Sequence, residues 1–340
     1  MPKIGSGPNS SENATYDESK EAMEDILDGG VKDATLGAFW LANRWKRNNP
    51  EELAGFLDAV LEDDVERVAP DVSPVDCGAN YDGKSQTAVL GVASGLVAAA
   101  AETPVVVHSG DRIPTQKDPC YKQVLANLGI ETDISPKESA ETVDDVGFGY
   151  YSQGNFNHAI DRLWSQRDAV GVRTFLNTVE TIVNPSLADV HLGSFYHLAF
   201  ARKIVDTVRE SRHLDFDRVI MFQGLEGYDD IRPGYTKVAE WRSGEELDSY
   251  EIETGEYGMD LEREDLEVDD IAVDSAEITE KVLAGDADQT WVDTVALNAG
   301  FRIYAGGNAE TVEAGVDEAR DIIRDGYAAD LLSELREFEP

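Results

Sequence analysis

The first residues that could do chemistry form a glycine-containing turn at positions 76–85. The turn reads Asp-Cys-Gly-Ala-Asn-Tyr-Asp-Gly-Lys-Ser and leads into a long uncharged segment. Such a turn offers backbone N–H groups and a helix N-terminus to an anion, and Lys84 would add positive charge. It is neither a Walker loop nor a dinucleotide fingerprint. Taken alone, these residues favour a structural turn over a phosphate site.

A second group follows a valine-rich run and contains His108 and Arg112 beside a glycine. A histidine and an arginine at the end of a strand could hold phosphate or orient a substrate. A capped loop with a surface arginine explains the same residues equally well.

A third group, residues 223–230, ends in the adjacent carboxylates Asp229 and Asp230 on a glycine-rich loop. Mg²⁺ accepts one or two carboxylates together with waters and substrate phosphates. An Asp-Asp pair is common in so acidic a chain, however, so a structural role is favoured until another observation points here.

A fourth group, residues 157–177, carries three arginines in a chain that has few basic residues: Arg162, Arg167 and Arg173. The forked guanidinium of arginine suits a carboxylate or a phosphate. Pairing with the many acids of the chain itself is the competing interpretation.

The elements that must position these groups differ between the two ends of the chain. The first sixty-odd residues read as three amphipathic helices, with Asp33 capping the second and Pro50 opening the third. After Pro70, short β-rich runs alternate with helical stretches, for example at residues 104–107, 146–150 and 218–222. This alternation predicts an α/β fold: a small N-terminal helical domain plus a larger domain built on a mainly parallel sheet.

Three further segments have a distinct composition. Residues 1–16 read as a flexible tail, and the acidic residues 250–274 as an exposed connection. The uncharged residues 87–101 are too short and too rich in Gly and Ser to span a bilayer, so a buried helix against a sheet is expected.

The net charge is −39, from 68 acidic and 29 basic residues spread over the whole chain. A basic partner is one interpretation, and a solvated surface suited to high salt is the favoured one, which suggests a halophilic source. The two cysteines give no disulfide framework, and the start lacks the blocks of a signal peptide. We expect a cytoplasmic protein that does not enter a membrane.

In order and spacing, these segments resemble the anthranilate phosphoribosyltransferases of glycosyltransferase family 3. The resemblance runs from about Ser19 to Leu335. It rests on the three N-terminal helices, on the crossover at residues 171–185, on the loop at residues 226–231 and on the closing helices. The loop at 226–231 is similar to the family's Asp-Gly-Leu-Asp-Glu-Ile metal loop.

The resemblance implies a helical domain at residues 17–66, completed by a crossover at 165–195, and an α/β domain at 70–164 and 196–340. It implies a homodimer and a reaction in which an aromatic amine displaces Mg²⁺-bound pyrophosphate from phosphoribosyl pyrophosphate. Catalysis of this kind positions the partners and neutralises charge. Asp229 and Asp230 would hold Mg²⁺. Arg167, with Asn157 and His158, would meet the acceptor.

The phosphoribosyl pyrophosphate loop would comprise Gly78, Asn80, Tyr81, Asp82, Gly83 and Lys84, with His108 and Arg112 beside it. The sequence departs from the family pattern here, because Asn80 and Tyr81 stand where bare glycine backbones let pyrophosphate approach. Further departures are Ala88-Val89-Leu90-Gly91 for Asn-x-Ser-Thr, Val107 for a lysine, Asn157 for a histidine, and Glu180-Thr181 for Gly-Pro.

The leading hypothesis is therefore phosphoribosyl transfer from phosphoribosyl pyrophosphate, or a related phosphorylated ribose, to a small aromatic or heterocyclic acceptor, with Mg²⁺. No catalytic residue is assigned. The alternative is a catalytically altered dimer that binds nucleic acid or a nucleotide-like ligand. The net charge of −39 opposes nucleic acid without excluding it.

Overall fold

The computed structural model describes residues 3–7 and 9–338 of the 340-residue chain. The α-helices are α1 (Tyr16–Leu27), α2 (Asp33–Lys46), α3 (Pro50–Glu62), α4 (Gly91–Ala100), α5 (Tyr121–Asn127), α6 (Pro136–Val146), α7 (Gln153–Phe156), α8 (His158–Asp161), α9 (Trp164–Val170), α10 (Leu176–Val179), α11 (Leu198–Glu210), α12 (Ile271–Leu283), α13 (Gln289–Gly306), α14 (Val312–Asp325) and α15 (Tyr327–Glu337). The strands are β1 (Val75–Gly78), β2 (Val105–Ser109), β3 (Phe148–Ser152), β4 (Val190–Phe195), β5 (Arg218–Gln223), β6 (Tyr235–Arg242) and β7 (Asp248–Glu253). Short 3₁₀ helices are η1 (Glu180–Ile182), η2 (Thr254–Tyr257) and η3 (Arg263–Leu266).

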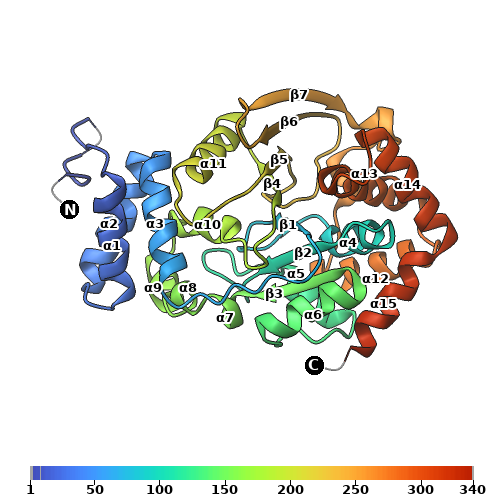
Figure 1. Cartoon of the computed structure of the whole chain (residues 1–340), viewed down its shortest axis with the longest axis horizontal. Helices are drawn as coiled ribbons and strands as arrows, with labels where there is room; N and C mark the ends of the chain where they lie inside the picture. Colours follow the sequence, from blue (N-terminus) through green and yellow to red (C-terminus); the bar gives the residue numbers. More distant parts are fainter. Residues whose placement is uncertain (1–2, 8, 339–340) are drawn as a thin grey trace.

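The strands of the described residues form one seven-stranded sheet in the order β3-β2-β1-β4-β5-β6-β7. The first five are parallel, while β6 and β7 continue the sheet as antiparallel strands. The predicted fold class is confirmed: a small helical domain beside a mainly parallel α/β domain. In Figure 1, α1, α2 and α3 stand together at one end of the molecule, and α12 to α15 cover the opposite end.

The N-terminal helices begin where local capping dictates. Thr15 and Asn49 each form a capping box at the start of α1 and α3, and Pro50 is the first residue of α3 as predicted. The predicted cap at Asp33 is wrong, because Lys32 occupies the cap position and makes no side-chain cap. Asp33 is instead the first residue of α2, where its charge still faces the positive end of the helix dipole.

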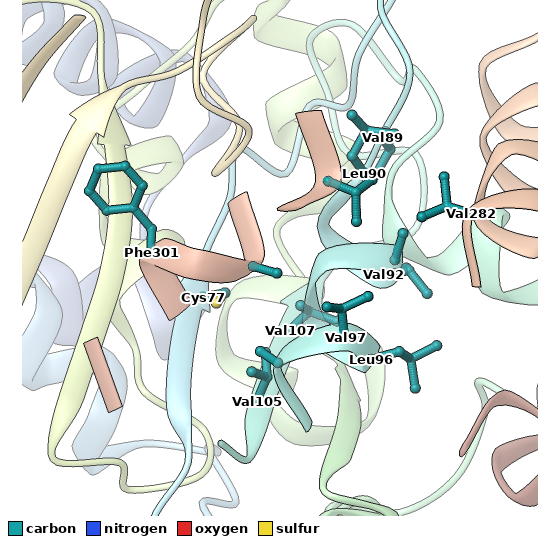
Figure 2. Close-up of a cluster of buried hydrophobic side chains, with 14 of the residues drawn as sticks. Cys77, Val89, Leu90, Val92, Leu96, Val97, Val105, Val107, Val282 and Phe301 are labelled. Atoms are coloured by element: carbon teal, nitrogen blue, oxygen red, sulfur yellow. The ribbon is translucent and has the colours of Figure 1, made fainter. Parts of the chain in front are cut away.

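The uncharged segment forms the buried helix α4, which lies against the sheet. Val92, Leu96 and Val97 are buried between β2 and the C-terminal helices (Figure 2). Gly95 permits this approach, since a Cβ there would lie 2.6 Å from the Phe148 ring. Along the described residues, no helix is both long and apolar enough to cross a membrane.

The prediction of an exposed connection at residues 250–274 is correct for the exposure of most of its side chains, but wrong in treating the segment as a connection without regular structure. That segment contains most of β7, both η2 and η3, and the first turn of α12. Met259 and Leu266 are buried in the main core, and Val268 donates its N–H to the carbonyl of Gln86. Apolar residues spaced between the acids therefore anchor a segment whose overall composition suggested a loop.

The crossover after β3 returns to the N-terminal helices before the chain enters β4. Phe175 stacks on Phe56 of α3, with ring centroids 4.0 Å apart, so the second core includes both segments. This packing brings η1 against the carboxyl end of β1, where the carbonyl of Thr181 lies next to Gly78. The domain limits drawn from the sequence stay a prediction, as does the flexible tail. Within that tail, Ile4 is buried.

Candidate functional site

Three loops meet where β1, β2 and β5 end, and the crossover lies against them. Ligands of open α/β sheets bind at such carboxyl ends. Asn80 donates its N–H to the carbonyl of Gly227, so the loop after β1 contacts the loop after β5. Thr181 packs on Gly78 so closely that a Cβ there would lie 2.2 Å from the Thr181 carbonyl oxygen. The sequence segments singled out for chemistry are thus brought together.

Asp230 is paired with a lysine of the same chain. The Lys84 ammonium lies 2.9 Å from Asp230 Oδ2 and donates to the Ala88 carbonyl at 2.5 Å. The N–H of Leu90 donates to the same carboxylate oxygen at 3.2 Å. Both ionic side chains are buried, so the cation that balances Asp230 is supplied from within the protein.

Both carboxylate oxygens of Asp229 also have hydrogen-bond donors within the chain. The guanidinium of Arg302, on α13, donates to Asp229 Oδ2, and the hydroxyl of Tyr121 donates to Oδ1. All three side chains are fully buried. Burial raises the pKa of Asp229, as does the charge of Asp230, and Arg302 opposes that rise.

These contacts do not fit a resident Mg²⁺ ion between the two carboxylates. Both oxygens of Asp229 and one of Asp230 are already bonded to donors of this chain, which leaves Asp230 Oδ1 without a partner in the described structure. The part of the chain that the structure describes also holds no cluster of three or more His, Cys, Asp or Glu side chains suited to a metal. The metal-binding role of Asp229 and Asp230 stays a prediction, and their contacts oppose it.

Tyr81 fills the loop after β1 with a buried phenol. Its hydroxyl is hydrogen-bonded to Nδ1 of His108, and its ring packs edge-on against the imidazole. Burial raises the pKa of Tyr81 well above its ordinary value, and the nearby charge of Glu180 raises it further. Tyr81 is therefore a neutral, space-filling group in this conformation.

Behind Tyr81 lies a buried chain of ionisable groups. Asp76 on β1 stands between two histidines: Oδ1 lies 3.2 Å from His108 Nε2, and Oδ2 lies 2.7 Å from His191 Nδ1. Burial raises the pKa of Asp76, but the charges and hydrogen bonds of the histidines outweigh it and lower that pKa to about 2. The chain fixes the orientation of His108 under the loop.

Asp82 links the loop to the crossover. Its Oδ2 accepts from Arg173 Nε at 2.6 Å, and its Oδ1 accepts from Asn177 Nδ2 at 2.6 Å. The carboxylate is buried, whereas the Arg173 side chain is 40% exposed. Gly83 then turns with a φ of +91°, packed on the Asp118 carbonyl.

Glu226 accepts hydrogen bonds from the backbone and side-chain donors of the segment that precedes α4. Its two carboxylate oxygens accept from the backbone N–H and the hydroxyl of both Ser85 and Thr87, at 2.9–3.0 Å. Burial raises the pKa of Glu226, but these hydrogen bonds outweigh that effect and lower it. Backbone N–H groups of this kind are anion donors, and here the anion is a side chain of the protein.

Arg167 is also paired within the chain. Its Nη1 and Nη2 donate to Oε2 and Oε1 of Glu180 at 2.7 and 2.9 Å, in the two-pronged arrangement typical of arginine and carboxylate. Both residues are buried. Asn157 is buried and caps α8 through its side-chain oxygen, while its Nδ2 has no partner in the described structure.

Arg112 and His158 lie outside this buried set. Both are exposed, and Arg112 donates to the carbonyl of Lys117 in its own loop. Their assignment to the site stays a prediction.

Sequence reasoning missed Arg302, Tyr121 and the partner role of Glu226. Arg302 did carry a signal, because it is the one charged residue in the run Val-Ala-Leu-Asn-Ala-Gly-Phe-Arg-Ile-Tyr-Ala at positions 295–305. A lone charge in a buried helix needs a buried partner. Nothing in the sequence identified that partner as Asp229.

Two family models match the chain. Residues 3–63 match the one described as glycosyl transferase family, helical bundle domain, and residues 76–329 match glycosyl transferase family, a/b domain. Among curated relatives, the anthranilate phosphoribosyltransferase of Nitrosomonas europaea is 31% identical over 331 residues, which cover 95% of this chain and 93% of that protein. The enzyme of the same name from Natronomonas pharaonis is 29% identical over 332 residues, 97% of each chain.

Solved structures with the same fold cover nearly the whole chain. Anthranilate phosphoribosyltransferase from Thermus thermophilus matches with a TM-score of 0.82 at 24% identity, over 98% of both chains. The Saccharomyces cerevisiae enzyme in complex with PRPP and Mg matches with a TM-score of 0.79 at 16% identity, over 99% of this chain and 95% of that one. At these identities the structural likeness establishes the fold alone.

The buried pair of Lys84 and Asp230 predicts strong thermodynamic coupling. Lys84→Met or Asp230→Asn alone should lower the free energy of unfolding by about 3–5 kcal/mol, because each leaves an unpaired buried charge. The double variant should lose less than the sum, with a coupling of about 1–3 kcal/mol, measured by urea unfolding. The exposed pair of Lys137 and Glu141 is the control and should show no measurable coupling. Additive losses at Lys84 and Asp230 would contradict the pairing.

The lowered pKa of Asp76 predicts how the stability of the fold changes at acid pH. Its pKa in the fold, about 2, lies below the ordinary 3.8, so it stabilises the fold above about pH 4 and this contribution is lost as the pH falls toward 2. The stability difference between wild type and Asp76→Asn should therefore shrink by about 2 kcal/mol over that range. Urea unfolding at a series of pH values measures it. Asp317→Asn, at an exposed position, should show a constant difference.

Proposed function

The chain belongs to the glycosyl transferase family that contains the anthranilate phosphoribosyltransferases, and we propose that it transfers a 5-phosphoribosyl group to an aromatic or heterocyclic acceptor. The observation that carries this proposal is the match over both domains, which includes the loops around the candidate site. The family resemblance drawn from the sequence is confirmed. The predicted halophilic source and cytoplasmic location stay predictions.

In the proposed reaction, the acceptor displaces pyrophosphate from phosphoribosyl pyrophosphate or a related phosphorylated ribose. The protein positions the two partners and neutralises charge as the bond to the leaving group breaks. Mg²⁺ enters in this proposal as part of the substrate, bound to its pyrophosphate. This assignment agrees with the internal pairing of Asp229 and Asp230, which leaves little room for a resident ion.

Arg173 is the group we propose to meet the anionic substrate. Lys84, Arg167 and Arg302 are buried and paired, whereas Arg173 is 40% exposed at the edge of the same cluster. Its partner Asp82 keeps a second hydrogen bond, from Asn177, when the guanidinium turns away. Tyr81 must also leave the loop for pyrophosphate to reach the backbone, so substrate binding is coupled to a local rearrangement.

The alternative of a dimer that binds nucleic acid stays a prediction. None of the relatives or solved structures described above is named for such a role. A net charge of −39 repels a phosphate backbone, because binding requires neutralisation by basic groups.

Phosphoribosyl transfer is tested by pyrophosphate release. Wild type with phosphoribosyl pyrophosphate, Mg²⁺ and a panel of aromatic acceptors should release pyrophosphate in an acceptor-dependent manner. Arg173→Gln should raise KM for phosphoribosyl pyrophosphate at least about tenfold, since one charge-assisted contact is lost. Arg162→Gln, on the same segment and 38% exposed, is the matched control and should leave KM unchanged. No calorimetric binding of phosphoribosyl pyrophosphate at millimolar concentration would refute the proposal.

We also propose a homodimer formed through α2 and α9. Trp45 is 75% exposed and Leu41, one turn before it on α2, is 36% exposed. An apolar groove between the same helices is lined by Ala34, Gly37, Ala169 and Val170. Exposed aromatic and aliphatic side chains beside such a groove are typical of protein interfaces.

Analytical ultracentrifugation tests this assembly. Wild type should sediment as a dimer, and Trp45→Glu should shift the population to monomer because a charge would be buried in the contact. Tyr327→Glu replaces another exposed aromatic on the distant α15 and should leave the dimer intact. A monomeric wild type at micromolar concentration would be incompatible with the proposal.

A further inference from the structure

In the candidate site, the carboxylate of Glu180 is paired with the buried guanidinium of Arg167. The carboxylate of Glu180 accepts hydrogen bonds from both terminal nitrogens of Arg167, at 2.7 and 2.9 Å. Its Oε2 also accepts from Gln153 Nε2 at 3.3 Å. The Glu180 side chain is completely buried, and that of Arg167 is 3% exposed. The best donors of the guanidinium are therefore used inside the protein.

Glu180 belongs to the same cluster as the loop after β1. The next residue, Thr181, packs its carbonyl against Gly78, the first glycine of that loop. Burial and the charge of Glu180 raise the pKa of Tyr81. Burial and the charge of Asp82 raise the pKa of Glu180, and Arg167 opposes that rise. The pair of Arg167 and Glu180 thus lies beside the groups that we propose to bind the phosphorylated ribose.

We propose that Glu180 determines acceptor specificity by holding the place of a ligand carboxylate on Arg167, so that the acceptor of this protein is an uncharged aromatic or heterocyclic molecule. This inference rests on the proposed function. An acceptor that carried a carboxylate would have to displace Glu180 and leave it buried without a partner. Breaking a buried pair in this way costs enough to weaken binding more than about a hundredfold.

One polar atom beside the pair, and a second one helical turn away from it, suit an uncharged ligand. Gln153 uses its amide nitrogen on Glu180, and its Oε1 is buried with no partner among the described residues. Asn157 Nδ2 is likewise buried and unpartnered there, one helical turn further along. Buried polar atoms normally find a partner, so a free acceptor and a free donor indicate a ligand with a neutral hydrogen-bonding edge.

Paired ligands that differ in one charge test the proposal. Anthranilate and 2-aminobenzamide share the ring and the amine, but one carries a carboxylate and the other an amide. Isothermal titration calorimetry of wild type should show that 2-aminobenzamide binds at least about a hundredfold more tightly than anthranilate. Equal affinities, or tighter binding of anthranilate, would overturn the proposal.

Chemical rescue provides the second arm. Glu180→Ala leaves Arg167 buried and unpaired, so added benzoate should raise its melting temperature while benzamide should not. Glu180→Gln keeps the shape of the side chain and should lose the wild-type preference against anthranilate even if Glu180→Ala fails to fold. Glu141→Ala, which removes an exposed glutamate, is the control and should behave as wild type toward all four ligands.

The outcomes separate this inference from the proposed function. Carboxylate rescue without pyrophosphate release would support the role of Glu180 and refute phosphoribosyl transfer. Pyrophosphate release with anthranilate at a kcat/KM equal to that with 2-aminobenzamide would support transfer and refute the role of Glu180. Absence of benzoate-dependent stabilisation in a folded Glu180→Ala variant would also refute it.

Discussion

Two buried ion pairs beneath the loops that follow β1 and β5 constrain everything around them. Lys84 with Asp230, and Arg302 with Asp229, place four charges out of water, and each charge is tolerated only because its partner is held within hydrogen-bonding distance. The lysine comes from the loop, the arginine from α13, and the two carboxylates from the turn after β5. The loop after β1, the helix α13 and the turn after β5 must therefore keep fixed relative positions, because any displacement would leave an unpaired charge in the core.

The same principle recurs through the site. Glu226 satisfies the N–H donors of Ser85 and Thr87, Glu180 satisfies Arg167, and Tyr81 fills the space over His108. Groups that would otherwise attract a phosphate, a carboxylate or a metal ion thus have partners supplied by the chain. The family fold is retained, while the charges that its ligands would supply are partly built in. A transferase of this kind is expected to select a ligand with fewer charges, and to open locally before it binds one.

The sequence anticipated the layout of the fold better than its irregular parts. Local signals located α1, α3 and α4: apolar periodicity for α1, the proline of the first turn for α3 and the uncharged run for α4. The strand β4 carries His, Gly and Ser between its apolar residues, and went unrecognised. β7 and the two short helices after it were hidden by acidic residues, because burial of a few anchors such as Met259 depends on partners distant in the chain.

By itself, the sequence determined the family, the two-part architecture and the residues at which the site departs from its relatives, because residue type and order are local information. Only the tertiary structure decided which charges neutralise which. Lys84 and Asp230 are 146 residues apart, and their pairing follows from the sheet order that joins β1 to β5 through β4. Arg302 and Asp229 are 73 apart, and their pairing also requires α13 to pack against the sheet. A charge in the sequence is a binding group or a structural one according to its partner, and the partner is set by the fold.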